Sequence, residues 1–142
     1  MFNHILLASD GSDCALKAAA VAATLAGKFA ARVTIINVYQ PFPTIGPYGD
    51  LINASLDERH ITELQEQAVS HTGCTVEEKG ISYQSRLEVG QPAAEIVRVA
   101  EAEGCDLIVL GSRGASGLTL FLLGSVCDRV VHHAHCPVLI VK

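Results

Sequence analysis

The chain has 142 residues, 49% of them hydrophobic, and its 15 acidic and 10 basic residues give a formal net charge of −5. This length suits a single domain over residues 1–142 with a well-packed core. The negative charge, with no stripe of Lys or Arg, argues against nucleic acid as a partner, and no apolar run approaches the roughly 20 residues of a membrane-spanning helix.

The N-terminal residues, MFNHILLASDGSD, do not resemble a signal peptide, because they lack a basic region and reach Asp10 after a short apolar run. We therefore expect a cytoplasmic protein without membrane insertion. The cysteines are scattered and form no CxxC motif, which favours reduced thiols in that compartment. They are Cys14, Cys74, Cys105, Cys127 and Cys136.

Apolar runs predict five strands: His4 to Ala8, Arg32 to Tyr39, Ser82 to Val89, Asp106 to Leu110 and Pro137 to Val141. Helical patterns fill the gaps, and this alternation indicates parallel βαβ units. The first, fourth and fifth runs are almost continuously apolar, which is typical of strands covered by helices on both faces. The sequence therefore predicts an α/β fold, a five-stranded parallel sheet between two layers of helices.

Four helices are predicted from their end signals. Ser12 is an expected N-cap for an Ala-rich helix over about 13–29. A second, amphipathic helix covers about 53–78, and Gly73 is expected to end or kink it. The third starts at Pro92 and stops at Gly104, and the fourth starts at Gly124-Ser125.

Residues 40–50, QPFPTIGPYGD, hold three prolines and two glycines. No helix or strand interior tolerates that composition. The segment is predicted to be a loop and is a candidate mobile lid.

Loops rich in Gly, Ser and Asp follow the first and fourth predicted strands, at residues 8–12 and 111–114. If these strands are neighbours with crossovers on opposite sides, their carboxyl ends form the crevice where open α/β sheets bind ligands. Gly111 and Gly114 can take positive φ, and the amides at Gly124-Ser125 attract anions at a helix start. The simpler alternative is that these glycines only end strands and begin helices.

Residues 111–125, GSRGASGLTLFLLGS, resemble the signature of the universal stress proteins: Gly, two residues, Gly, nine residues, then Gly and Ser or Thr. The resemblance also covers Asp10-Gly11-Ser12, Gly90-x-Pro92 and the closing CPVLIVK, so it spans the chain.

The resemblance implies the ATP-binding branch of that family, with strand order 3-2-1-4-5 and a homodimer formed through the last strand, Pro137 to Val141. It implies binding of ATP or AMP, with any Mg²⁺ held by the phosphates, and a role in the stress response through an unknown protein partner. The implied nucleotide-binding residues are Ala8, Ser9 and Asp10 at the adenosine, Val38 at adenine through its backbone, Leu110 and Gly111 near the ribose, and Arg113, Gly114, Gly124, Ser125, Val126 and Cys127 around the phosphates.

Two positions depart from the family pattern. Similar proteins often have proline where this chain has Ala8, and a hydroxyl residue where it has Cys127. The first change matters little because backbone geometry is used there. The second weakens a phosphate contact, since a thiol is a poorer donor than a hydroxyl.

Alternatives remain open at this stage. Asp10 could cap the first helix or shape its turn instead of binding, and Arg113 could be a solvated loop side chain. The chain has no P-loop lysine, so we expect no fast ATPase and no catalytic residue. A slow ATPase or phosphotransferase with Asp10 as base is the runner-up, and a dimeric interaction module that binds no nucleotide is the third hypothesis.

The sequence HHAHC contains His132, His133, His135 and Cys136. Adjacent histidines on a helix point apart, so we expect no metal site there. Cys14, Cys105 and Cys127 are expected to pack as small apolar side chains. Cys127 is also a candidate reactive thiol, because a helix N-terminus lowers a thiol pKa.

Overall fold

The computed structural model describes residues 1–41, 57–113 and 123–142. Its parallel sheet has the order β3-β2-β1-β4-β5, as expected. The predicted strands are confirmed to within one residue at their ends. They are β1 (His4–Ala8), β2 (Arg32–Tyr39), β3 (Tyr83–Val89), β4 (Leu107–Gly111) and β5 (Val138–Val141).

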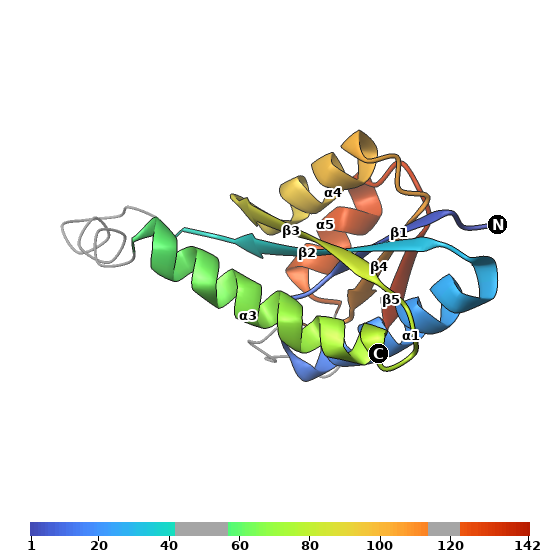
Figure 1. The fold of residues 1–142 in the computed structure, drawn as a ribbon. Coiled ribbons are helices and arrows are strands. Elements are labelled where there is room, and N and C mark those ends of the chain that lie inside the picture. Colours follow the sequence, from blue (N-terminus) through green and yellow to red (C-terminus); the bar gives the residue numbers. More distant parts are fainter. Residues whose placement is uncertain (42–56, 114–122) are drawn as a thin grey trace.

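Helices cover both faces of the sheet, which gives three layers (Figure 1). On one face lie α1 (Asp13–Phe29) and α3 (Glu58–Glu77), and on the other α4 (Pro92–Ala102) and α5 (Ser125–His133). Ile5 and Leu7 of β1 belong to the core under α1, whereas Leu6 belongs to the core on the α4 side. Because successive strand residues face opposite layers, a strand buried on both faces must be a continuous apolar run.

Helix α1 packs closely because its buried face consists of alanines. Its predicted N-cap is confirmed: the Ser12 hydroxyl accepts a hydrogen bond from the Ala15 amide at 3.3 Å. Ala18, Ala19 and Ala22 are fully buried against the sheet. Small side chains on this face let the helix axis approach the strands and bring its N-terminus close to the end of β1.

The prediction that Gly73 ends or kinks a helix is wrong. Helix α3 begins after the N-cap Asp57 and continues through Gly73 to Glu77. A Cβ at Gly73 would overlap the ring of Tyr83 on β3, so this glycine makes room for an aromatic ring. The expected start near Asn53 and nearly all of the candidate lid at 40–50 lie outside the described residues.

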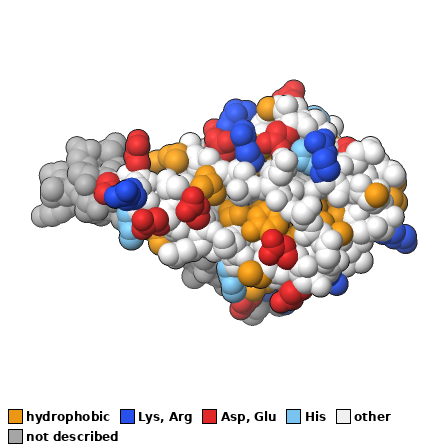
Figure 2. Space-filling model, viewed as in Figure 1, with side chains coloured by type: hydrophobic (Ala, Val, Ile, Leu, Met, Phe, Trp, Pro, Cys, Tyr) orange, Lys and Arg blue, Asp and Glu red, His pale blue; other side chains and the backbone are white. Residues whose placement is uncertain are grey.

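Charged side chains of both signs gather over the α4 side of the sheet (Figure 2). Arg98 of α4 pairs with Glu88 at 3.0 Å and with Glu95 at 2.6 Å. Arg86 of β3 pairs with Glu88 at 3.3 Å and with Glu103 at 3.0 Å. Exposed pairs of this kind add little stability.

Among the described residues, none of the helices combines the length and the apolar character that a membrane span requires.

Candidate functional site

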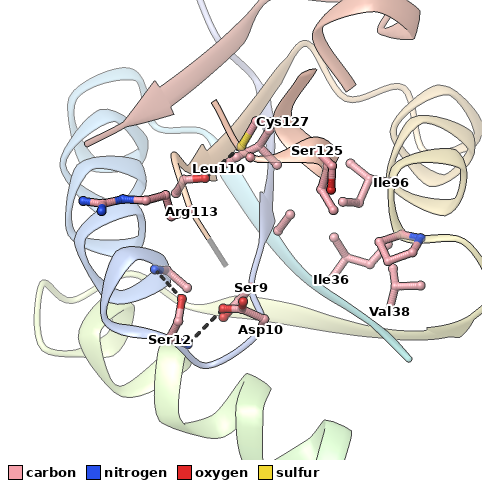
Figure 3. Close-up of a pocket in the computed structure, with 16 residues that line it drawn as sticks. Ser9, Asp10, Ser12, Ile36, Val38, Ile96, Leu110, Arg113, Ser125 and Cys127 are labelled. Carbon is pink, nitrogen blue, oxygen red and sulfur yellow. Dashed lines mark hydrogen bonds between the residues drawn. The ribbon is translucent and has the colours of Figure 1, made fainter. Parts of the chain in front are cut away.

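A cavity of about 250 Å³ opens at the carboxyl ends of β1 and β4 (Figure 3). β1 lies between β2 and β4 in the sheet. Helix α1, which follows β1, lies on one face, and α5, which follows β4, lies on the other. This is the switch point at which open α/β sheets leave a crevice.

All the predicted site residues within the described ranges line this cavity, and Gly114 lies outside those ranges. The predicted residues that line the cavity are Ala8, Ser9, Asp10, Val38, Leu110, Gly111, Arg113, Gly124, Ser125, Val126 and Cys127. The structure thus brings together segments that are more than one hundred residues apart in the chain.

One wall of the cavity is apolar. Ile36 and Val38 come from β2, and Pro92 and Ile96 come from α4. Figure 3 shows Ile36, Val38 and Ile96 grouped on one side of the pocket, with Arg113 on the other side near α1. A flat apolar group fits the first side, and an anion fits the second.

The polar wall is formed where two helices begin. Helix α1 starts at Asp13 with its N-cap Ser12 in the lining, and α5 starts at Ser125 after the N-cap Gly124. The Ser12 side chain caps α1, whereas no side chain of the described residues is hydrogen-bonded as a cap of α5. Uncapped amides and the positive end of the helix dipole attract an anion.

Asp10 shapes the turn between β1 and α1. Its Oδ1 accepts a hydrogen bond from the Ser12 amide at 2.9 Å, and Gly11 between them has φ +79°. The structural role proposed for Asp10 is therefore present. The same carboxylate lines the pocket, so a ligand contact remains compatible with it.

Gly111 does not use the positive φ that a glycine can take, because the left-handed glycines among the described residues are at other positions. A Cβ at Gly111 would lie 2.8 Å from the backbone carbon and oxygen of Cys14 in α1. Gly124 has φ −59°, and a Cβ there would lie 3.2 Å from the Ser112 oxygen. Close approach of the α1 backbone requires glycine at position 111, whereas a side chain at position 124 would make a tight contact with the Ser112 oxygen.

The structure does not favour the reactive thiol that the place of Cys127 at a helix N-terminus suggests, because this side chain is buried. Burial raises its pKa, and this outweighs the lowering effect of its own backbone N–H. Its Sγ donates to the Gly111 oxygen at 2.9 Å, so the thiol faces the end of β4. Burial likewise raises the pKa of Cys105 to about 12, as expected for a small buried side chain.

A buried polar network supports the pocket from behind. Asn37 Nδ2 donates to the backbone carbonyl oxygen of Ser9 at 2.9 Å. The hydroxyls of Ser9 and Thr72 are hydrogen-bonded to each other at 2.5 Å. Gln65 of α3 donates to the oxygens of Asn37 at 3.2 Å and Glu88 at 2.8 Å. Helix α3 is thereby joined to the carboxyl ends of β1, β2 and β3.

The comparison that decides the family is with the sequence model of the universal stress protein family, which matches residues 1–142. The chain belongs to the universal stress protein family. A relative from Methanocaldococcus jannaschii, itself a universal stress protein, is 38% identical over 146 residues, covering 100% of this chain and 83% of that one.

Solved universal stress proteins share the fold. One from Lactobacillus plantarum is 25% identical with a TM-score of 0.84, covering 99% of this chain and 98% of its own. Another, solved in complex with cAMP, is 27% identical with a TM-score of 0.69, covering 99% of this chain and 97% of its own.

Five lining residues of this universal stress protein were not predicted from its sequence: Ser12, Ala15, Ile36, Pro92 and Ile96. Ser12 and Pro92 were recognised as helix-start residues, but not as part of a site. Ile36 and Ile96 looked like ordinary core residues, and only the packing of α4 beside β2 places them at the cavity. Ile36 lies within β2 and Ile96 within α4, so neither stands at a strand end where the sequence indicates a site.

Proposed function

We propose that this universal stress protein is a regulatory protein that binds an adenine nucleotide, ATP or AMP, in the pocket at the ends of β1 and β4. The observation that carries the proposal is a single pocket with an apolar wall on one side and two helix N-termini on the other. The relative solved in complex with cAMP supports an adenine nucleotide over other anions.

The base lies against the apolar wall. Ile36, Val38 and Ile96 offer contact surface for a flat ring, and the backbone of Val38 at the end of β2 supplies hydrogen bonds to its edge. The ribose lies over Asp10 and Gly111, where a carboxylate accepts hydrogen bonds from hydroxyl groups.

The phosphates lie at the start of α5, beside Gly124, Ser125 and Arg113. The uncapped amides of this helix bind phosphate oxygens without a lysine, and the Arg113 guanidinium adds a charge-assisted contact. A Mg²⁺ ion would be held by the phosphates themselves. This arrangement favours binding over rapid hydrolysis.

Gly124→Val tests where the phosphates lie. The added side chain crowds the Ser112 oxygen, so the start of α5 shifts, and we expect the affinity for ATP to fall at least about tenfold, or 1.4 kcal/mol. Adenosine binding should stay the same. Gly27→Val in α1, where a Cβ meets only the end of the Ile81 side chain at 3.6 Å, is the control. Equal losses for ATP and adenosine would contradict this placement.

We further propose that the protein is a homodimer paired through β5, the edge strand of the sheet. The Pro137 oxygen accepts a hydrogen bond from the Ile108 amide of β4, and the Val141 oxygen accepts one from the Ser112 amide just after β4. Strand alternation therefore turns the N–H and C=O groups of Val138 and Ile140 outward. An unpaired apolar edge favours association with a second copy.

Sedimentation equilibrium tests the dimer. We expect a dimer at micromolar protein, and Ile140→Pro should shift it toward monomer, because proline removes an outward donor while the bonds to β4 remain. A parent protein that sediments only as monomer would contradict this proposal.

A further inference from the structure

A cluster of side chains able to bind a metal lies at the amino ends of β1 and β4, whereas the pocket lies at their carboxyl ends. His4 at the start of β1 and Cys105 just before β4 are buried, with exposures of 4% and 3%. The Glu103 side chain reaches them and is 22% exposed. One ligand atom from each of the three lies within 4.8 Å of the other two.

The topology makes these residues neighbours. β1 pairs with β4, and the Asp106 amide donates to the His4 oxygen at 3.0 Å. The Asp106 carboxylate accepts hydrogen bonds from the amides of Asn3 at 2.8 Å and His4 at 3.1 Å. The connection between α4 and β4 is therefore fixed to the start of β1, and the cluster is held by backbone contacts.

The imidazole is surrounded by polar groups that fix its orientation. His4 Nδ1 lies 3.3 Å from the Glu103 carbonyl oxygen and 3.4 Å from an Arg32 guanidinium nitrogen. His4 Nε2 lies 2.8 Å from the Thr34 hydroxyl and 3.8 Å from Glu103 Oε2. The Thr34 hydroxyl also donates to Glu103 Oε2 at 3.3 Å. Binding of an ion at Nε2 requires the tautomer with the hydrogen on Nδ1, where it donates to the Glu103 carbonyl.

We propose that His4 Nε2, Glu103 Oε2 and Cys105 Sγ bind a thiophilic divalent cation such as Zn²⁺, with water as the fourth ligand. Zinc bond lengths of about 2.0–2.3 Å place tetrahedral ligand atoms about 3.3–3.6 Å apart. The separation of 3.8 Å between His4 and Glu103 is close to this spacing, and the Cys105 thiol, within 4.8 Å of both, would move closer on binding.

The charges balance in this site. Binding replaces the thiol proton of Cys105, which leaves to solvent, so one thiolate and one carboxylate neutralise the two positive charges of the ion. Arg86 pairs with Glu103 Oε1 at 3.0 Å, and at Oε2 the ion would replace the hydrogen bond from the Thr34 hydroxyl. The Glu103 carbonyl orients the imidazole, as outer hydrogen bonds do for metal-bound histidines. The partly exposed carboxylate is the side from which an ion enters.

The C-terminal histidines lack these features. His132 and His133 are exposed, and their Nδ1 atoms lie 2.7 and 2.8 Å from carbonyl oxygens of their own helix. The cluster at His4 is also separate from the pocket, because His4 and Ala8 are at opposite ends of β1, roughly 13 Å apart at about 3.3 Å per residue. Its test therefore does not depend on nucleotide binding.

Titration of the reduced, metal-free protein with Co²⁺, a coloured substitute for Zn²⁺, tests the site. We expect one equivalent to bind with a thiolate-to-cobalt charge-transfer band in the near ultraviolet, and Zn²⁺ to abolish this band by displacement. Cys105→Ser should lose the band. Glu103→Gln should keep it but bind Co²⁺ at least tenfold more weakly, and circular dichroism checks that both variants fold.

Two control variants test whether other cysteine or histidine side chains of the chain bind the Co²⁺. Cys74→Ser changes an exposed cysteine of α3, and the double variant His132→Gln, His133→Gln removes the exposed histidines. Both should retain the band and the affinity of the parent. Absence of the band in the parent protein, its persistence in Cys105→Ser, or its loss in the histidine double variant would each overturn the proposal.

Discussion

At the residue scale, the pocket depends on positions where a side chain is absent. Gly111 at the end of β4 lets the first turn of α1 approach the strand, and Gly124 lets the start of α5 approach Ser112. Both helix N-termini reach the cavity for this reason. The requirement is for space rather than for an unusual backbone angle.

Gly111→Ala is therefore expected to destabilise the fold. Its Cβ would lie 2.8 Å from backbone atoms of Cys14, which cannot rotate away, so α1 must shift. We expect a loss of about 1–3 kcal/mol in the free energy of unfolding, measured by urea denaturation. Gly27→Ala, at an open helical position, should be as stable as the parent or more so. An unchanged Gly111→Ala midpoint would refute the packing argument.

The cysteines should differ in reactivity according to their burial. Cys74 is exposed on α3, whereas Cys105 and Cys127 are buried and have raised pKa values, so both stay protonated at pH 8. With a thiol reagent at that pH we expect a fast phase that Cys74→Ser removes. Cys127 should react at the rate of unfolding. Fast labelling of Cys127 in the folded protein, identified by peptide mass, would contradict this assignment.

At the scale of elements, α3 does more than cover one face of the sheet. Gln65 is buried and donates to the carbonyl oxygens of Asn37 and Glu88, at the ends of β2 and β3. Thr72 is bonded to Ser9 at the end of β1. One helix thus holds the carboxyl ends of three strands, the same ends at which the pocket lies.

Gln65→Leu tests this role of α3. The variant leaves two carbonyl groups without their donor, and we expect a destabilisation of about 1–3 kcal/mol in urea denaturation. The same change at the exposed Gln67 is the matched control and should alter stability by less than about 0.5 kcal/mol. Similar effects at both positions would show that the hydrogen bonds of Gln65 have no special role.

At the scale of the whole molecule, the features predictable from sequence were those encoded locally. The apolar runs of β1 and β4, the Ser12 cap and the alanines of α1 each report their own environment, and together they predict the layered sheet. The role of Gly73 is not predictable in this way, because the glycine makes room for the ring of Tyr83, a residue on another element.

The candidate site was predictable where it follows strand ends and a helix start, and less so where packing creates it. Ile36 and Ile96 reach the cavity only because α4 lies beside β2. The cluster of His4, Glu103 and Cys105 also arises from strand order, since no local spacing joins the three. Long-range contacts of this kind leave no periodic signal in the chain.

Equilibrium dialysis of the nucleotide-free protein against labelled ATP with Mg²⁺, with GTP as competitor, tests the central claim most directly. We predict saturable binding of one ATP per chain at about micromolar affinity, near −8 kcal/mol, that excess GTP does not displace. Absence of binding up to about millimolar ATP, near −4 kcal/mol, would contradict the account and leave the glycines with a purely structural role.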